Sequence, residues 1–90
     1  MINVKKLLEI MLENKKLFDS GLCGWADNLY CYDKISYIER ITLRVYIQFN
    51  RPKWYSSIDA YNHKDNSYFW KPENIEPRLK WINKHIKLNS

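Results

Sequence analysis

The chain has 90 residues, of which 46% are hydrophobic and 28% are charged, so it predicts one small globular domain and leaves no room for a second. Lysines and arginines exceed aspartates and glutamates by 15 to 10, and a net charge of +5 favours anionic partners without separating a nucleotide from a nucleic acid or an acidic protein. The aromatic share of 16%, with four tryptophans, exceeds what so small a core needs, and we expect some rings at the surface.

The first predicted helix covers residues 2–17. Its apolar side chains recur at the spacing of one helix face, while lysines and glutamates take the other side. The apolar positions are Val4, Leu7, Leu8, Met11 and Leu12. Because Glu9 and Glu13 interrupt the stretch, it predicts neither a signal peptide nor a membrane span, and we expect a cytoplasmic protein with no membrane partner.

A second helix is expected to begin at Leu22, after a break at residues 18–21. Asp19 or Ser20 is the candidate N-cap, because short polar side chains accept the free N–H groups of a first helical turn. The helix should end near residues 30–33. Its inward side chains are predicted to be Leu22, Trp25, Ala26 and Leu29.

The start of a third helix carries the clearest local signal. Ser36 and Glu39 match a capping box, in which the serine accepts from the backbone three residues on and the glutamate reaches back to the serine N–H. This pattern predicts a helix from Tyr37 to about Asn50. The helix should stop before Pro52, because proline disfavours helical geometry in the residue that precedes it.

This third helix is apolar on two sides. One stripe consists of Ile38, Ile41, Val45 and Phe49, and the other of Leu43, Tyr46 and Ile47. A helix of this kind is either central to its domain or shared with a second subunit. In so short a chain we take it as an indication of a homo-oligomer.

Residues 53–70 are rich in aromatic side chains and are interrupted by turn-forming residues at 62–66, so they predict either a loose β-hairpin or an irregular loop. A turn at 71–75, with Pro77 in the first helical position, predicts a last helix over 77–88. The inner face of this helix is expected to consist of Leu79, Ile82 and Ile86. Two adjacent rows are expected on its outer side, one of Lys80, Lys84 and Lys87 and the other of Arg78, Trp81 and His85. The fold class is therefore mainly α: a small four-helix domain with an irregular or β-hairpin-like aromatic segment before the last helix.

Five short features carry a resemblance. They are Gly21-Leu22-Cys23, Glu39 in the capping motif, Arg51-Pro52, Tyr68-Phe69-Trp70-Lys71-Pro72 and Pro77-Arg78-Leu79-Lys80-Trp81-Ile82. In this order, over roughly residues 20–86, they resemble a class of short proteins encoded by bacteriophages and prophages. The resemblance carries over no activity. It implies a setting in the host-cell cytoplasm, where small phage proteins counter host defence by blocking a defence protein or by sequestering a nucleotide signal.

Residues 67–85 concentrate groups that can stack on, or neutralise, an anionic ligand. The candidate ligand-binding residues are Trp70, Lys71, Arg78, Trp81 and His85. Arginine pairs with phosphate oxygens through two N–H groups, indole faces stack on a base, and the free N–H groups of a helix start add positive potential. These residues predict a site for a nucleotide-like anion. The alternative is that both tryptophans are core rings and the lysines form an ordinary solvated face.

Two other binding functions would use neighbouring residues. A protein-binding inhibitor of a host defence protein would dock through exposed aromatic side chains, since such rings dominate interface energies. The candidate interface residues are Trp54, Tyr55, Tyr61, Tyr68 and Phe69. A small nucleic-acid-binding protein would instead contact phosphates through Lys80, Lys84 and Lys87.

Metal binding and catalysis find less support. Cys23 and Cys31 are eight residues apart, which is not the close pair of a structural zinc site, and we expect them as reduced thiols. No spacing joins either cysteine to His63 or His85 as a nucleophile and its base. The sequence therefore predicts a non-enzymatic binding protein without a cofactor or a metal.

Overall fold

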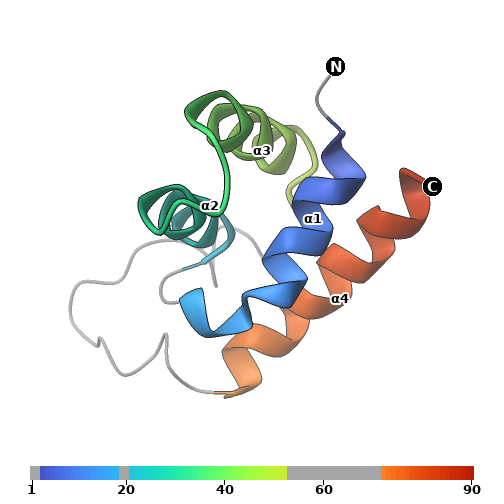
Figure 1. Ribbon diagram of the computed structural model, residues 1–90. Helices are drawn as coiled ribbons and strands as arrows, with labels where there is room; N and C mark the ends of the chain where they lie inside the picture. Colours follow the sequence, from blue (N-terminus) through green and yellow to red (C-terminus); the bar gives the residue numbers. More distant parts are fainter. Residues whose placement is uncertain (1–2, 19–20, 53–71) are drawn as a thin grey trace.

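The computed structural model describes residues 3–18, 21–52 and 72–90 (Figure 1). These residues form four α-helices and a short 3₁₀ turn, with no strand among them. The elements are α1 (Val4–Glu13), η1 (Lys15–Leu17), α2 (Leu22–Cys31), α3 (Tyr37–Phe49) and α4 (Pro72–Leu88). The prediction of a mainly helical four-helix domain is confirmed, whereas the hairpin or loop predicted for 53–70 lies outside the described residues.

The first predicted helix is divided in two at Asn14. Asn3 caps the start of α1 by accepting the Lys6 N–H at 3.3 Å. At the other end the Asn14 side chain donates to the Ile10 carbonyl at 2.8 Å. Side-chain amides that bond to nearby backbone compete with helix continuation, so α1 ends at Glu13 and the chain tightens into η1.

α2 begins at Leu22, as predicted, but without a side-chain cap. The N-cap position is Gly21, whose φ of 135° lies in the left-handed region that glycine enters at little cost. The prediction of Asp19 or Ser20 at this position was wrong, because the chain enters the helix through a backbone geometry that favours glycine over the residues with capping side chains.

The capping box at the start of α3 is confirmed. Ser36 Oγ accepts the Glu39 N–H at 3.2 Å, and Glu39 Oε1 accepts the Ser36 N–H at 2.7 Å. α3 ends at Phe49, before Pro52, which confirms the predicted end of the helix.

α4 begins at Pro72, five residues before the predicted start, and Pro77 lies inside the helix. Proline is favoured in the first turn of a helix, and both Pro72 and Pro77 satisfy this preference. The helix begins at Pro72, whereas the prediction placed its start at Pro77. An interior proline removes one backbone hydrogen bond and costs about 3 kcal/mol. The later turns of α4 offset that cost by burying Trp81 and Ile82.

The four helices pack as two neighbouring pairs around one core. α2 lies along α3, α1 lies along α4, and α1 also contacts α3 (Figure 1). Trp25 is fully buried, donates its indole N–H to the Asn14 carbonyl at 3.0 Å, and meets the Phe18 ring edge-on at 5.5 Å. The other core side chains are Leu7, Leu8, Met11, Leu22, Ala26, Leu29, Ile35, Leu43, Ile47, Trp81 and Ile82.

The face of α4 that enters this core differs from the predicted one. Ile82 is buried as expected, but Leu79 and Ile86 are only half-buried, and Arg78, Trp81 and His85 are buried instead of facing outward. The indole of Trp81 offers more apolar area than either aliphatic side chain, and partners on other elements satisfy the polar atoms of Trp81 and His85. No helix among the described residues is long and apolar enough to cross a membrane.

Replacement of Ser36 by alanine is expected to lower the free energy of unfolding by about 1 kcal/mol, because the Glu39 N–H loses its acceptor. Ser36→Thr keeps a hydroxyl at this position and is the matched control. Urea denaturation followed by circular dichroism measures both variants. Equal stability of the alanine and threonine variants would contradict a contribution from the capping box.

Candidate functional site

Arg78, the predicted phosphate ligand, lies in the interior. Its side chain is fully buried, and the guanidinium carbon lies 5.1 Å from the centroid of the Phe18 ring. A cation over an aromatic face is attracted by the ring quadrupole, so this contact helps to hold α4 against the segment between η1 and α2. Trp70 and Lys71, the predicted neighbours of Arg78 in the ligand site, lie outside the described residues.

Trp81 and His85 form a buried cluster with Tyr46 of α3, which we call the Tyr46 cluster. The rings of Trp81 and His85 lie 4.4 Å apart between centroids, and Tyr46 meets both of them edge-on. The Trp81 indole N–H donates to the Asn50 carbonyl at 2.9 Å. One face of the indole is therefore occupied by the imidazole, and its polar atom is satisfied within the chain.

The surroundings of His85 in the Tyr46 cluster favour the neutral form of its imidazole. The Tyr46 hydroxyl lies 2.7 Å from His85 Nδ1 and accepts a hydrogen bond from the Asn89 side-chain amide at 2.9 Å. Burial, followed by repulsion from Lys84, lowers the pKa of His85 below its ordinary value. The neutral imidazole can accept a hydrogen bond from the Tyr46 hydroxyl at Nδ1, so His85 joins α4 to α3 as an uncharged group.

A hollow of about 380 Å³ opens on the outer side of the Tyr46 cluster, and we call it the basic hollow. It is lined by Pro52, Pro77, Lys80, Trp81 and Lys84. Lys80 and Lys84 are exposed one turn apart on α4, and neither forms an ion pair with any residue that the structure describes. The structure thus brings Trp81 together with two lysines that the sequence assigned to nucleic-acid phosphates, whereas Arg78 and His85 are turned into the core.

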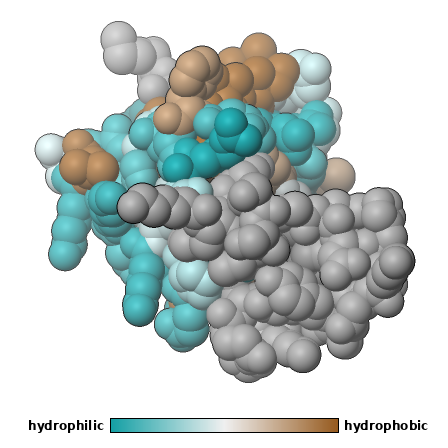
Figure 2. All heavy atoms as spheres, turned by 180° about the vertical axis from the view of Figure 1, so that it is seen from behind, coloured by the Kyte–Doolittle hydropathy of each residue, from teal (hydrophilic) through white to brown (hydrophobic). Residues whose placement is uncertain are grey.

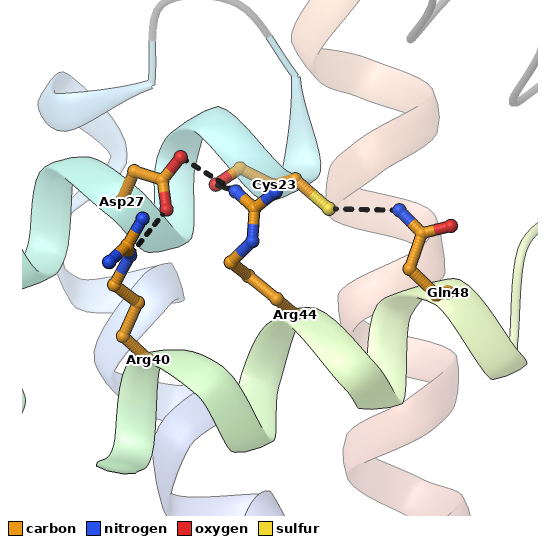
Figure 3. A network of polar contacts seen from close by, with 5 residues as sticks. All are labelled: Cys23, Asp27, Arg40, Arg44 and Gln48. Atoms are coloured by element: carbon orange, nitrogen blue, oxygen red, sulfur yellow. Dashed lines mark hydrogen bonds and ion pairs between the residues drawn. The ribbon is translucent and has the colours of Figure 1, made fainter. Parts of the chain in front are cut away.

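A second surface is organised by Asp27 of α2, which sequence analysis did not single out. Its carboxylate accepts hydrogen bonds from Arg40 Nε at 2.7 Å and from Arg44 at 2.6 Å (Figure 3). Beside this pair, Gln48 donates to the Cys23 sulfur at 3.4 Å. The signal that could have found this network is the one-turn spacing of two arginines on α3 opposite the single acidic residue of α2.

The stripe of α3 that points away from Asp27 and the core is apolar and exposed, and we call it the outer face of α3. Its exposed fractions range from 40% to 84%, and its members are Ile38, Ile41, Val45 and Phe49. A shallow hollow of about 260 Å³ along it is lined by Ile41, Arg44, Val45, Gln48 and Phe49. Figure 2 shows apolar surface gathered at the top of the molecule, the end at which α3 lies in Figure 1.

The remaining candidates divide between described and undescribed residues. The predicted protein-interface set lies outside the described residues, as does His63; that set is Trp54, Tyr55, Tyr61, Tyr68 and Phe69. Cys23 and Cys31 are not joined to each other by a disulfide. Among the residues that the structure describes, no group of three histidine, cysteine or acidic side chains could hold a metal ion.

Comparison of the chain with protein-family models, with curated proteins and with solved structures finds no match. The basic hollow and the outer face of α3 are therefore interpreted from their geometry and chemistry.

Protonation of His85 is expected to destabilise the folded protein in mild acid. Since the folded pKa is lowered, the unfolded chain binds more protons than the folded one as the pH falls below about 6.5, and the free energy of unfolding falls with it. The contribution is complete above that pH and is lost as the pH approaches the folded pKa. Urea denaturation at several values between about pH 7.5 and about pH 5 measures the slope.

His85→Gln should flatten this slope, because the titrating group is gone. His63→Gln removes the other histidine of the chain and is the matched control. A slope that disappears with His63 and survives the loss of His85 would contradict the assignment.

Proposed function

We propose that the protein is a non-enzymatic binding protein that takes up a phosphate-bearing, nucleotide-like small molecule at the basic hollow. The observation that supports this proposal is the position of Lys80 and Lys84 at a hollow whose wall includes the Trp81 indole. No other hollow described above places two exposed cations beside an aromatic ring.

The chemistry of the basic hollow suits a ligand with a charged end and a flat end. The ammonium groups of Lys80 and Lys84 can each donate to phosphate oxygens, and such charge-assisted hydrogen bonds are about twice as strong as neutral ones. Pro52, Pro77 and the edge of Trp81 offer an apolar wall for a ring. A volume of about 380 Å³ is at the small end of ligand sites, which favours a molecule of nucleotide size over a longer polymer.

Sequestration of a nucleotide signal fits this arrangement within the setting that the phage resemblance implies. A protein that only holds its ligand needs binding groups and no nucleophile or general base near them. The residues that line the basic hollow are cationic, aromatic or proline side chains, which can bind and orient an anionic ligand. We therefore assign the function to binding in the host-cell cytoplasm and to counter-defence.

A second candidate function is the blocking of a host defence protein, and the outer face of α3 favours it. Exposed apolar side chains at helical spacing are how an amphipathic helix docks in the groove of a partner. Tyr30 and Tyr37 stack edge-on at 5.8 Å near the start of α3, with Arg40 5.4 Å from the Tyr30 ring. Tyrosine and arginine are enriched at protein interfaces.

Isothermal calorimetry against cyclic di- and trinucleotides and ADP-ribose derivatives tests the first candidate. We expect at least one of these ligands to bind, and Lys80→Glu combined with Lys84→Glu to weaken it by about tenfold or more, because each lost charge-assisted hydrogen bond costs about 1.5–3 kcal/mol. Higher salt should weaken binding as well.

Lys6→Glu combined with Lys87→Glu changes the net charge by the same amount at exposed positions that do not line the basic hollow, and is the matched control. It should leave affinity within about twofold, since screened charges at a distance contribute little. Absence of heat with every ligand, or equal losses in the two double variants, would overturn the proposal for this site.

A further inference from the structure

Binding at the basic hollow leaves the outer face of α3 unexplained. All α3 residues with high exposure are uncharged: Tyr37, Ile38, Ile41, Val45, Gln48 and Phe49. The exposed positions of α1 and α4, by contrast, include lysines and glutamates. A helix face that stays in contact with solvent usually carries charged side chains. Because this face carries none, we expect a binding partner to cover it.

The charged residues of α3 are held by partners within the same chain, and of these Arg44 also lines the hollow on the outer face. Glu39 closes the capping box with Ser36. Arg40 and Arg44 are both bound to Asp27 of the same chain. The hydrogen bond to Asp27 raises the pKa of Arg40, so that guanidinium stays charged and paired. What the outer face presents to a partner is therefore apolar contact, with Gln48 and the paired Arg44 at its rim.

We propose that the occupant is a second copy of this chain, bound through antiparallel pairing of the two α3 helices about a twofold axis. The spacing of the outer face supports this arrangement because it reads nearly the same in both directions. With the axis between Ile41 and Val45, Ile41 of each copy lies opposite Val45 of the other, and Ile38 lies opposite Gln48, the residue before Phe49. Closed twofold pairing needs such a self-complementary patch.

The hollow on the outer face has the form that this pairing requires. Its lining includes Ile41, Arg44, Val45 and Gln48, which are residues i, i+3, i+4 and i+7 of one helix. Four residues at this spacing make the hole that receives one side chain of a facing helix. In the antiparallel arrangement the side chain from the second copy that meets this hole is Ile41.

Charge also favours the outer face of α3, rather than a face that carries lysines, for contact between two copies of the chain. The chain carries a net charge of +5, so two copies repel each other wherever lysines meet. The outer face of α3 brings no lysine to the contact, and the two arginines at its edge are already paired with Asp27. Two such faces can approach without contact between lysines, and Asp27 reduces the charge of the two arginines at the edge of each face from +2 to +1.

The dimer is expected to be weak and dependent on concentration. α3 has 13 residues and is about 20 Å long, so a single pair of these helices lies at the small end of specific interfaces. Analytical ultracentrifugation up to about 1 mM protein should show reversible monomer–dimer exchange. A chain that remains monomeric over this range would overturn the proposal and leave the face to a different protein.

Single substitutions then test the face. Val45→Glu and Ile41→Lys should each weaken the dimer by about tenfold or more, because each buries an unpaired charge near the axis. Leu88→Lys replaces an exposed apolar residue of α4 and is the matched control, with no change expected. Circular dichroism verifies that all three variants keep the helical fold. A dimer that survives both α3 substitutions would contradict the assigned face.

Mixing the two α3 variants tests the antiparallel register. In a mixed dimer the lysine that replaces Ile41 in one copy would lie opposite the glutamate that replaces Val45 in the other. The native Val45 and Ile41 of the two chains would still meet, so association should recover relative to either variant alone. Recovery is not expected for a parallel pair, in which each position meets its own copy. Failure to recover would overturn the antiparallel arrangement.

Ligand binding at the basic hollow should be unchanged in these variants, because Ile41 and Val45 do not line it. The dimer and the proposed ligand site are therefore tested separately.

Discussion

The rotation of α3 about its own axis depends on Asp27. This helix has two apolar stripes, and each has the side chains of a core face. The carboxylate of Asp27 holds Arg40 and Arg44 at 2.7 and 2.6 Å on the α2 side. With the arginines held there, Leu43 and Ile47 enter the core and the stripe from Ile38 to Phe49 faces outward. Partly exposed ion pairs contribute little free energy, so the pairs with Asp27 add to an orientation that the burial of Leu43 and Ile47 also stabilises.

Tyr46 fixes the other edge of α3 in the same way. Its hydroxyl meets His85 while the Trp81 indole bonds to Asn50 just past the end of the helix, so α4 is attached to α3 at two adjacent points. This attachment orients α4 and places Lys80 and Lys84 on its solvent side. The cations available to a ligand are therefore Lys80 and Lys84, whereas Arg78 and His85 are buried and contribute to the packing of the core.

The sequence predicted those features that depend on neighbouring residues. The capping box and the proline at 52 located both ends of α3, because each acts within one turn of the helix end. The start of α4 was missed because two prolines satisfy the same local rule and the choice between them depends on packing. The inner face of α4 was missed because Phe18, Tyr46 and Asn50, which accommodate its polar side chains, are distant in the chain. The same holds for the site: both apolar stripes of α3 were predicted, but which of them meets solvent depends on contacts with Asp27 and His85, which are distant in the chain.

The two surfaces proposed for binding are joined by a short stretch of chain. Phe49 belongs to the outer face of α3, Asn50 accepts the Trp81 indole N–H, and Pro52 lines the basic hollow. Proximity alone does not couple two sites, because coupling requires an element with two arrangements that both ligands bias. Asn50 is held at both ends, since its side chain donates to the Tyr46 carbonyl and its own carbonyl accepts from Trp81. A stretch fixed in this way favours independent binding, in which a pair of chains carries two ligand sites that fill without cooperativity.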